Sequence, residues 1–366
     1  MAGFISLPTT KQGCYQSLVF EYSHTIVGNS NRMSIEVDVL INSNSFRTLY
    51  LNTYSSVTEV SGDYVYTFDI DISKIVQSFF NNIQFFYDTS KTYPYTDACL
   101  TADVALDVYR YEPDANGILT RNASATRSNN RLFFNSLKND FSDYTASSGR
   151  KFITKNTDYR LSSEVTNLLA SYSDVNANVI NIVNETTLVV TNVNMTDDQI
   201  NIINLNDYFS NGDSQLTVSL GTLDGVDFTI TGQQIRYDIL DNKCESIGLH
   251  FQSELGVSEV FIFKTYEYEI SKSRETELYV SSNDLERMYS GKIDKSINIE
   301  RNGFFTAEWL FFSDVITSSI FYIEQTTGAL NEAFSTFNNL PYRTISNQID
   351  VNLSFTYSDK QKIFSN

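Results

Sequence analysis

The stretch Ile349-Asp-Val-Asn-Leu-Ser-Phe-Thr-Tyr357 alternates apolar and polar residues without interruption. Because successive side chains on a strand point to opposite faces, this pattern predicts a strand with one buried and one solvated face. Shorter or less regular versions, rich in β-branched and aromatic residues, occur in Met33–Val39, Tyr64–Ile70, Ala102–Tyr109, Thr217–Leu220, Val226–Ile230 and Val260–Phe263. The sequence therefore predicts a mainly β chain.

A few short segments have helical spacing instead. In 72–80, apolar residues recur at three- and four-residue intervals, and either Asp71 or Ser73 is placed to cap the start of a helix. Asn283 precedes Glu286 by three residues, a spacing that resembles a capping box. The remaining candidate helices are Ser163–Ser171 and the aromatic-rich segment Thr306–Ile316.

The order of these segments favours two β-sandwich-like domains with a few short helices and an irregular Asn-rich central region. We expect an N-terminal β-sandwich-like domain over residues 1–113. Residues 114–213 are expected to form the irregular central region with short strands, because their apolar blocks are short and separated by polar residues. Residues 214–366 are expected to form a C-terminal β-rich domain with two short helices.

Composition limits the function. The 366-residue chain has 44 acidic and 26 basic residues, a net charge of −18, which argues against phosphate-backbone binding, so we expect no sequence-specific nucleic acid as partner. A hydrophobic fraction of 41% excludes wholesale disorder. The first residues lack the pattern of a secretory signal, and no apolar run is long enough for a membrane helix. We therefore expect a protein made in a cytoplasm, with no membrane partner.

Candidate catalytic and metal-binding residues are sparse. The two histidines, His24 and His250, have no cluster of partner residues nearby in sequence, so we expect structural roles for both. The three cysteines are far apart and do not form a metal-ligating pattern. Asp69 and Asp71 share a strand face, but their position before a helix favours capping over calcium binding. We accordingly expect no cofactor, no metal and no catalytic site.

One segment carries a more specific pattern. An apolar strand containing Phe251 leads to a turn at Gly256, then to the acidic Glu259 and the aromatic pair Phe261 and Phe263. Trp309-Leu310, a Phe321-Tyr322-Ile323 strand and the closing alternation at 352–357 follow, and the segment Phe68–Phe79 adds a second similarity. Together these segments resemble structural virion proteins of tailed phages that infect Bacteroidetes, a group that includes the crAss-like phages.

The resemblance implies a non-enzymatic component of a phage tail, collar ring or baseplate, located in the virion and made in the host cytoplasm. Its expected partners are further copies of itself in a cyclic homo-oligomer and neighbouring tail or portal-proximal proteins. A ring requires a heterologous interface. We expect that interface at Trp309, Phe311 and Phe312 or in the Asn-rich centre, unless these aromatic side chains pack in the core instead.

Two other functions stay open at this stage. A glycan-binding or host-receptor-binding module of the virion is the first alternative, and exposed tyrosine or tryptophan on one sandwich face would favour it. A polysaccharide-cleaving enzyme is the second, because a pair of catalytic carboxylates meets in space and leaves no sequence motif.

Overall fold

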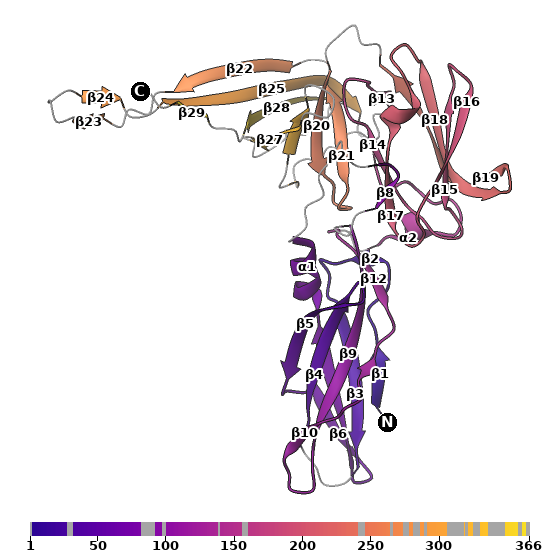
Figure 1. Ribbon diagram of the computed structural model, residues 1–366, viewed down its shortest axis with the longest axis vertical. Coiled ribbons are helices and arrows are strands. Elements are labelled where there is room, and N and C mark those ends of the chain that lie inside the picture. Colours follow the sequence, from indigo (N-terminus) through magenta and orange to yellow (C-terminus); the bar gives the residue numbers. More distant parts are fainter. Residues whose placement is uncertain are drawn as a thin grey trace. The chain divides into compact units, whose positions relative to one another are not determined.

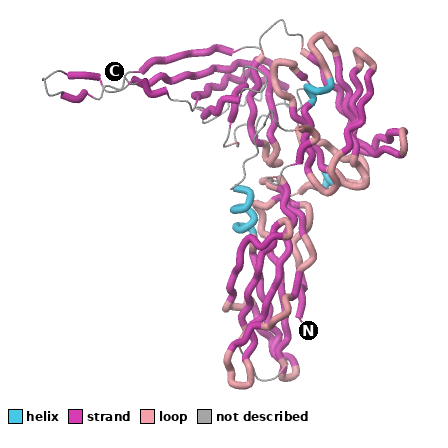
Figure 2. The backbone as a smooth tube through the Cα atoms, viewed as in Figure 1, coloured by secondary structure: helices cyan, strands magenta, loops and turns pink. Residues whose placement is uncertain are grey.

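A computed structural model describes the backbone of residues 2–27, 32–81, 92–96, 100–137, 140–155, 160–240 and 246–263. Beyond these it describes 266–273, 278–280, 286–288, 291–305, 318, 321–324, 330–335, 348–357 and 361–363. Strands dominate these residues and helices are few (Figures 1 and 2). The expected mainly β fold is confirmed.

The chain divides into two compact units, the first formed by residues 1–85 and 96–145 and the second by 86–95 and 146–366. The expected boundaries at 113 and 213 do not coincide with this division. Strands that follow residue 113 pair back onto the strand that ends there, so the first unit continues to 145. The strand that follows residue 213 pairs with 179–184, which joins 146–213 to the second unit.

The first unit is a sandwich of two sheets with short helices α1 (Ser73–Asn81) and α2 (Ser142–Thr145). One sheet has the order β1-β3-β7-β6, made of β1 (Ala2–Ser6), β3 (Val19–Ile26), β7 (Asp63–Asp71) and β6 (Ser56–Val60). The other has the order β2-β12-β9-β4-β5, made of β2 (Gln12–Gly13), β12 (Arg131–Phe134), β9 (Thr101–Pro113), β4 (Ser34–Ile41) and β5 (Asn44–Leu51). Strands β10 (Leu119–Arg121) and β11 (Thr126–Arg127) pair with β9.

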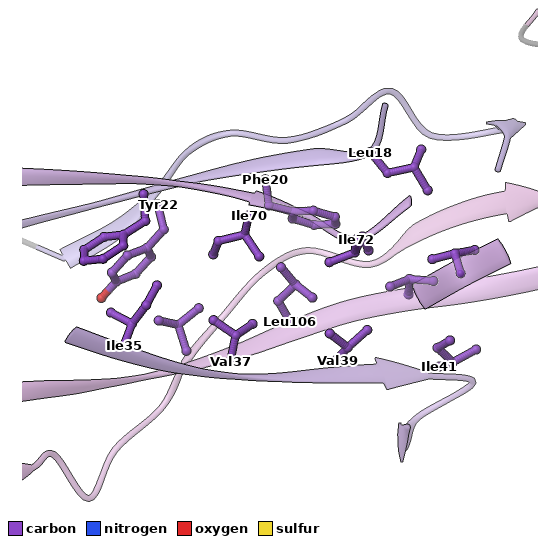
Figure 3. Packing of buried hydrophobic residues seen from close by; sticks show 14 of the residues in the cluster. Leu18, Phe20, Tyr22, Ile35, Val37, Val39, Ile41, Ile70, Ile72 and Leu106 are labelled. Carbon is purple, nitrogen blue, oxygen red and sulfur yellow. The ribbon is translucent and has the colours of Figure 1, made fainter. Parts of the chain in front are cut away.

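Alternate residues of the two sheets form a single apolar core. Phe20 and Ile70 come from the first sheet, and Val37 and Leu106 from the second, and all are buried. Figure 3 shows these side chains meeting between the two layers. The inward positions are the apolar residues of the sequence alternation, so the predicted strands 33–39, 64–70 and 102–109 are confirmed.

The predicted helix after residue 72 is also confirmed, as α1. Asp71 rather than Ser73 provides the capping side chain, since its Oδ1 accepts a hydrogen bond from the Ser73 backbone nitrogen at 2.9 Å. The Asp71 side chain therefore acts at a helix start, as the sequence favoured.

The sequence predicts irregular structure with short strands over residues 114–213; in the second unit, residues 146–213 contribute short strands to two sheets that also contain strands from outside this range. One sheet has the order β13-β19-β18-β15-β16, made of β13 (Arg160–Leu161), β19 (Asp227–Ile239), β18 (Gln215–Asp224), β15 (Val179–Asn184) and β16 (Val189–Asn194). The other has the order β14-β17-β8, made of β14 (Leu168–Tyr172), β17 (Ile200–Asn204) and β8 (Tyr95–Thr96), and a short 3-10 helix η1 (Leu205–Tyr208) follows β17. Leu169 and Ile203 pack in one cluster with Ile180 and Val218, so these sheets share a core.

Two helix predictions are wrong. Residues 163–171 do not form a helix, because Leu168–Tyr172 pairs with β17 and all five of its residues are buried. Glu286, the end of the expected capping box, begins strand β24 (Glu286–Met288), which pairs with β23 (Leu278–Val280). In both cases strand pairing decided the conformation over local spacing. The predicted helix Thr306–Ile316 lies outside the described residues. Of the two helices expected in 214–366, the one at Asn283–Glu286 is therefore wrong and the other stays a prediction.

The largest sheet has the order β21-β20-β26-β27-β28-β25-β22, with β29 (Gln361–Ile363) paired to β25. Its other strands are β20 (Ile247–Gln252), β21 (Ser258–Phe263), β22 (Tyr266–Ser273), β25 (Gly291–Phe305), β26 (Phe321–Glu324), β27 (Leu330–Ser335) and β28 (Gln348–Tyr357). The stretch 349–357 lies in β28, where Leu353 and Phe355 are buried and Ser354 and Thr356 are partly exposed. The strand prediction is confirmed.

We expect Leu106→Ala to lower the free energy of unfolding of the first unit by about 2–5 kcal/mol, because it removes buried methyl groups and leaves a cavity. Urea unfolding followed by circular dichroism measures this change. Val226→Ala is the control, since Val226 is 90% exposed, and should change the free energy by less than about 0.5 kcal/mol. Equal effects of the two substitutions would contradict the core described above.

Candidate functional site

The interface residues expected from the sequence, Trp309, Phe311 and Phe312, lie outside the described residues. Their role stays a prediction.

The segment that carried the family resemblance is part of the core. Strands β20 and β21 form an antiparallel pair, and Gly256 turns the chain between them with a φ of +80°. Phe251, Phe261 and Phe263 are all buried. The pattern therefore specifies a hairpin, with the glycine at a backbone conformation that other residues rarely adopt.

Two sheet edges of the first unit carry exposed apolar side chains. Strand β5 ends one sheet and β6 ends the other. All five residues of β6 are exposed, and Val57 and Val60 are 43% and 53% exposed. On β5, Phe46 is also exposed. Among the described residues no strand pairs with the outer side of either one, which leaves backbone groups open to a partner strand.

The second unit has a comparable edge. Strand β16 ends its five-stranded sheet, and no described strand lies beyond it. Leu188, Val189 and Val190 are 76%, 57% and 59% exposed at the start of this strand. An edge strand with consecutive exposed apolar residues is a candidate site for pairing with another chain.

The outward face of β4, β5 and β9 carries an aromatic row, which we call the Tyr50 face. Cross-strand register places Tyr50 opposite Glu36 and Glu36 opposite Tyr109. Tyr50 is 67% exposed, whereas Glu36 is only 7% exposed. The Arg121 guanidinium lies over the Tyr109 ring, 3.7 Å from its centroid, which is a cation–π distance.

The Glu36 carboxylate organises this face. Its Oε1 accepts hydrogen bonds from Arg121 Nη2 at 2.5 Å and from Arg121 Nε at 3.1 Å. Its Oε2 accepts from the Tyr111 hydroxyl at 2.8 Å, and the Tyr50 hydroxyl also donates to this carboxylate. The bonds from Arg121 hold the pKa of Glu36 below its ordinary value, although burial acts in the opposite direction.

A polar row follows next to the aromatic one. Thr48 lies opposite Asp38, Asp38 opposite Asp107, and Asp107 opposite Arg127. The Thr48 hydroxyl donates to Asp38 at 2.5 Å, and Arg127 donates to both carboxylate oxygens of Asp107 at 2.9 and 3.2 Å. Two carboxylates directly opposite on neighbouring strands repel each other, and these donors offset part of that repulsion.

Both histidines lie in polar contacts inside the protein. His24 Nε2 is 3.0 Å from Glu112 Oε1, and the Arg110 guanidinium also contacts the ring. Burial, followed by the charge of Arg110, lowers the pKa of His24. In the second unit, His250 Nε2 lies 2.7 Å from Glu324 Oε2, and both residues are buried.

Thr166 completes the buried contact in the second unit. Its backbone nitrogen donates to Glu324 Oε2 at 2.8 Å and its hydroxyl donates to Oε1 at 2.7 Å. These bonds link the segment before β14 to β20 and β26, so this cluster joins the central sheets to the large sheet. The sequence could not indicate it, because Thr166, His250 and Glu324 are far apart in the chain.

The described residues contain neither a group of metal ligands nor a reactive cysteine thiol. No group of three or more possible ligands among histidine, cysteine, aspartate and glutamate meets within the part of the chain that the structure describes. Cys14 is buried, and burial raises the pKa of its thiol to about 12, so it is not a reactive thiolate. Cys99 and Cys244 lie outside the described residues. No described helix is long and apolar enough to cross a membrane.

Comparisons with known proteins do not identify the chain. No protein-family model and no curated protein match it. Among solved structures, a chain from the study "Structural insight into host cell surface retention of a 1.5-MDa bacterial ice-binding adhesin" aligns with 94% of this chain and 91% of its own length. The sequence identity is 8% and the TM-score is 0.19, so the likeness carries no conclusion about fold or function.

We expect Thr166→Val to lower the free energy of unfolding by about 1–3 kcal/mol, because it leaves a buried oxygen of Glu324 without its hydroxyl donor. Chemical denaturation of the full chain measures the change. Thr229→Val, at an exposed position of β19, is the matched control and should be nearly neutral. A loss no greater than that of the control would rule out a stabilising role for this bond.

We also expect Glu36 to make stability depend on pH. Since its pKa is lowered on folding, its contribution is fully present above the ordinary glutamate value of about 4.3 and is lost as the pH falls through the folded-state value. Glu36→Gln should therefore lose less stability than the wild type between about pH 6 and pH 3. Thermal unfolding across this range, with exposed Glu59→Gln as control, tests the sign.

Proposed function

We propose that this chain is a non-enzymatic structural protein of a phage virion, which assembles with further copies of itself into a ring or a component of the tail or baseplate. The observation that carries the proposal is the pair of exposed sheet edges at β5 and β6. The family resemblance in the sequence supports the virion setting. Neighbouring tail or portal-proximal proteins are the other proposed partners.

An exposed edge strand favours assembly because its unpaired backbone groups match those of another strand. Monomeric proteins generally block such edges with charged side chains, prolines or a covering segment. Strand β6 contains two exposed valines and a single charged residue, Glu59. The exposed apolar area and the open backbone groups would both be buried by the same partner strand.

A cyclic assembly needs two different surfaces on each copy that fit one another. The β5 and β6 edges of the first unit and the β16 edge of the second unit are two different surfaces that each copy offers. Head-to-tail pairing of one with the other would close into a ring if the rotation between copies allowed it. The net charge of −18 keeps free subunits apart by mutual repulsion, which would favour assembly only where specific contacts form.

Glycan or host-receptor binding is the alternative function. One observation favours it, namely that Tyr50 is 67% exposed on a sheet face. This function does not exclude assembly, because a sheet face and a sheet edge are separate surfaces.

We expect the full-length protein to form a discrete oligomer at micromolar concentration. Native mass spectrometry gives the copy number, and negative-stain electron microscopy shows whether the particles are rings. A protein that stays monomeric from about 1 to 100 μM, and that is absent from purified particles of its source, would contradict the proposed function.

We expect the double substitution Val57→Lys and Val60→Lys to shift the population toward monomer, because charged lysines on an edge strand oppose pairing. Val226→Lys is the matched control, since Val226 is also exposed but lies in the turn between β18 and β19. Light scattering after size exclusion measures the masses. An oligomer that resists the double substitution would place the interface elsewhere, with Trp309, Phe311 and Phe312 as the next residues to substitute.

A further inference from the structure

The Tyr50 face has the features of a carbohydrate-binding surface, and we propose that it binds a neutral oligosaccharide. The proposal concerns the outward side of β4, β5 and β9, so it does not depend on assembly through the strand edges. It rests on three observations: the fixed aromatic rings, the neighbouring row of polar groups, and the charge of the face and of the chain.

The aromatic rings are held in place before a ligand arrives. The Tyr50 and Tyr111 hydroxyls both donate to the Glu36 carboxylate, and Arg121 stacks on the Tyr109 ring. Binding would therefore cost little side-chain entropy. The C–H groups on the apolar face of a sugar ring are electropositive and fit the electron-rich face of an aromatic ring. Tyr50, 67% exposed, offers such a face to solvent.

The extent of the face favours an oligosaccharide over a single sugar. Tyr50 lies on β5 and Tyr109 on β9, and Glu36 on the intervening strand β4 lies between them. Neighbouring strands are about 5 Å apart, so the two tyrosines are separated by about 10 Å. That distance exceeds one sugar ring, so a chain of two or more sugars can stack on Tyr50 and reach the Arg121 guanidinium that covers the Tyr109 ring.

The polar row supplies partners for sugar hydroxyls. Asp38 and Asp107 lie opposite each other, two residues along the strands from the aromatic row, which is about 7 Å. Thr48 and Arg127 fix the two carboxylates, and their remaining lone pairs can accept hydrogen bonds from hydroxyl groups. Two opposed carboxylates are unfavourable in an ordinary strand pair, and a ligand that donates hydrogen bonds to both would relieve their repulsion.

The negative charge of the face and of the chain favours neutral over acidic sugars. The face presents the carboxylates of Asp38 and Asp107, of which Asp107 is paired with Arg127, while Arg121 is paired with the buried carboxylate of Glu36. The whole chain carries a net charge of −18. An acidic polysaccharide would be repelled, whereas a neutral one would not. Neutral sugars also match an acceptor-rich row, because each hydroxyl can donate.

The test is a microarray of neutral oligosaccharides, which includes mannans, β-glucans, xylans and arabinans, together with acidic polygalacturonate and alginate, probed with the full-length protein. Calorimetry with each hit gives the dissociation constant. We expect saturable binding to at least one neutral oligosaccharide, and none to the acidic ones. Absence of binding to every neutral sugar, or binding confined to the acidic polymers, would overturn the proposal.

Variants then place the binding on the Tyr50 face. Tyr50→Ala should weaken binding of the hit about tenfold, since a stacking contact is lost. Tyr50→Phe, which keeps the ring, should stay within about threefold of the wild type. Asp38→Asn should weaken binding at least fivefold, because the amide replaces one accepting oxygen by a donor.

Tyr15→Ala is the matched control, because Tyr15 is a partly exposed tyrosine (39%) of the first unit that does not belong to the face. It should bind like the wild type. Circular dichroism confirms that each variant is folded. Equal affinities of folded Tyr50→Ala and wild type would show that the sugar binds elsewhere and would overturn the assignment. The oligomer is measured separately. A negative sugar-binding result therefore does not bear on the proposed assembly, and a monomeric protein can still be tested for sugar binding at the Tyr50 face.

Discussion

In the first unit, the cross-strand register of β4 and β9 decides which side chains are buried and which face outward. Val37 lies opposite Val108 and both are buried, so Glu36 and Tyr109 must project to the other side of the sheet. A shift of one residue would move the apolar set to solvent and the charged set into the core. The core and the outward face are therefore two consequences of one pairing.

Among the described residues, the two-sheet arrangement also leaves the outermost strand of each sheet without a partner strand on its outer side. A sandwich buries its inner faces but cannot pair its outermost strands within a single copy, unlike a closed barrel. Strands β5, β6 and β16 occupy such positions, and apolar side chains on them are exposed. The proposed assembly would use these edges, whereas the proposed ligand binding would use the outward face of a sheet, so the two proposals concern different surfaces of the fold.

Polar contacts, rather than apolar packing alone, join parts of the second unit. Arg150 is fully buried, and its Nη2 donates to both oxygens of Asp174 at 2.8 Å. Glu324 is equally buried and accepts from Thr166, with His250 in contact. A buried charge without such partners would be strongly unfavourable, so these pairs restrict how the surrounding strands can be arranged.

Alternation alone determined the strands at 33–39, 64–70, 102–109 and 349–357, because period two is a local property of the chain. The helix at Ser73 could also be read locally, since it starts beside its own cap. Leu168–Tyr172 could not, because pairing with β17 overrode its helical spacing. The Tyr50 face and the Glu324 cluster were likewise decided only by tertiary structure, since the groups that meet there come from distant strands whose register no local pattern reveals.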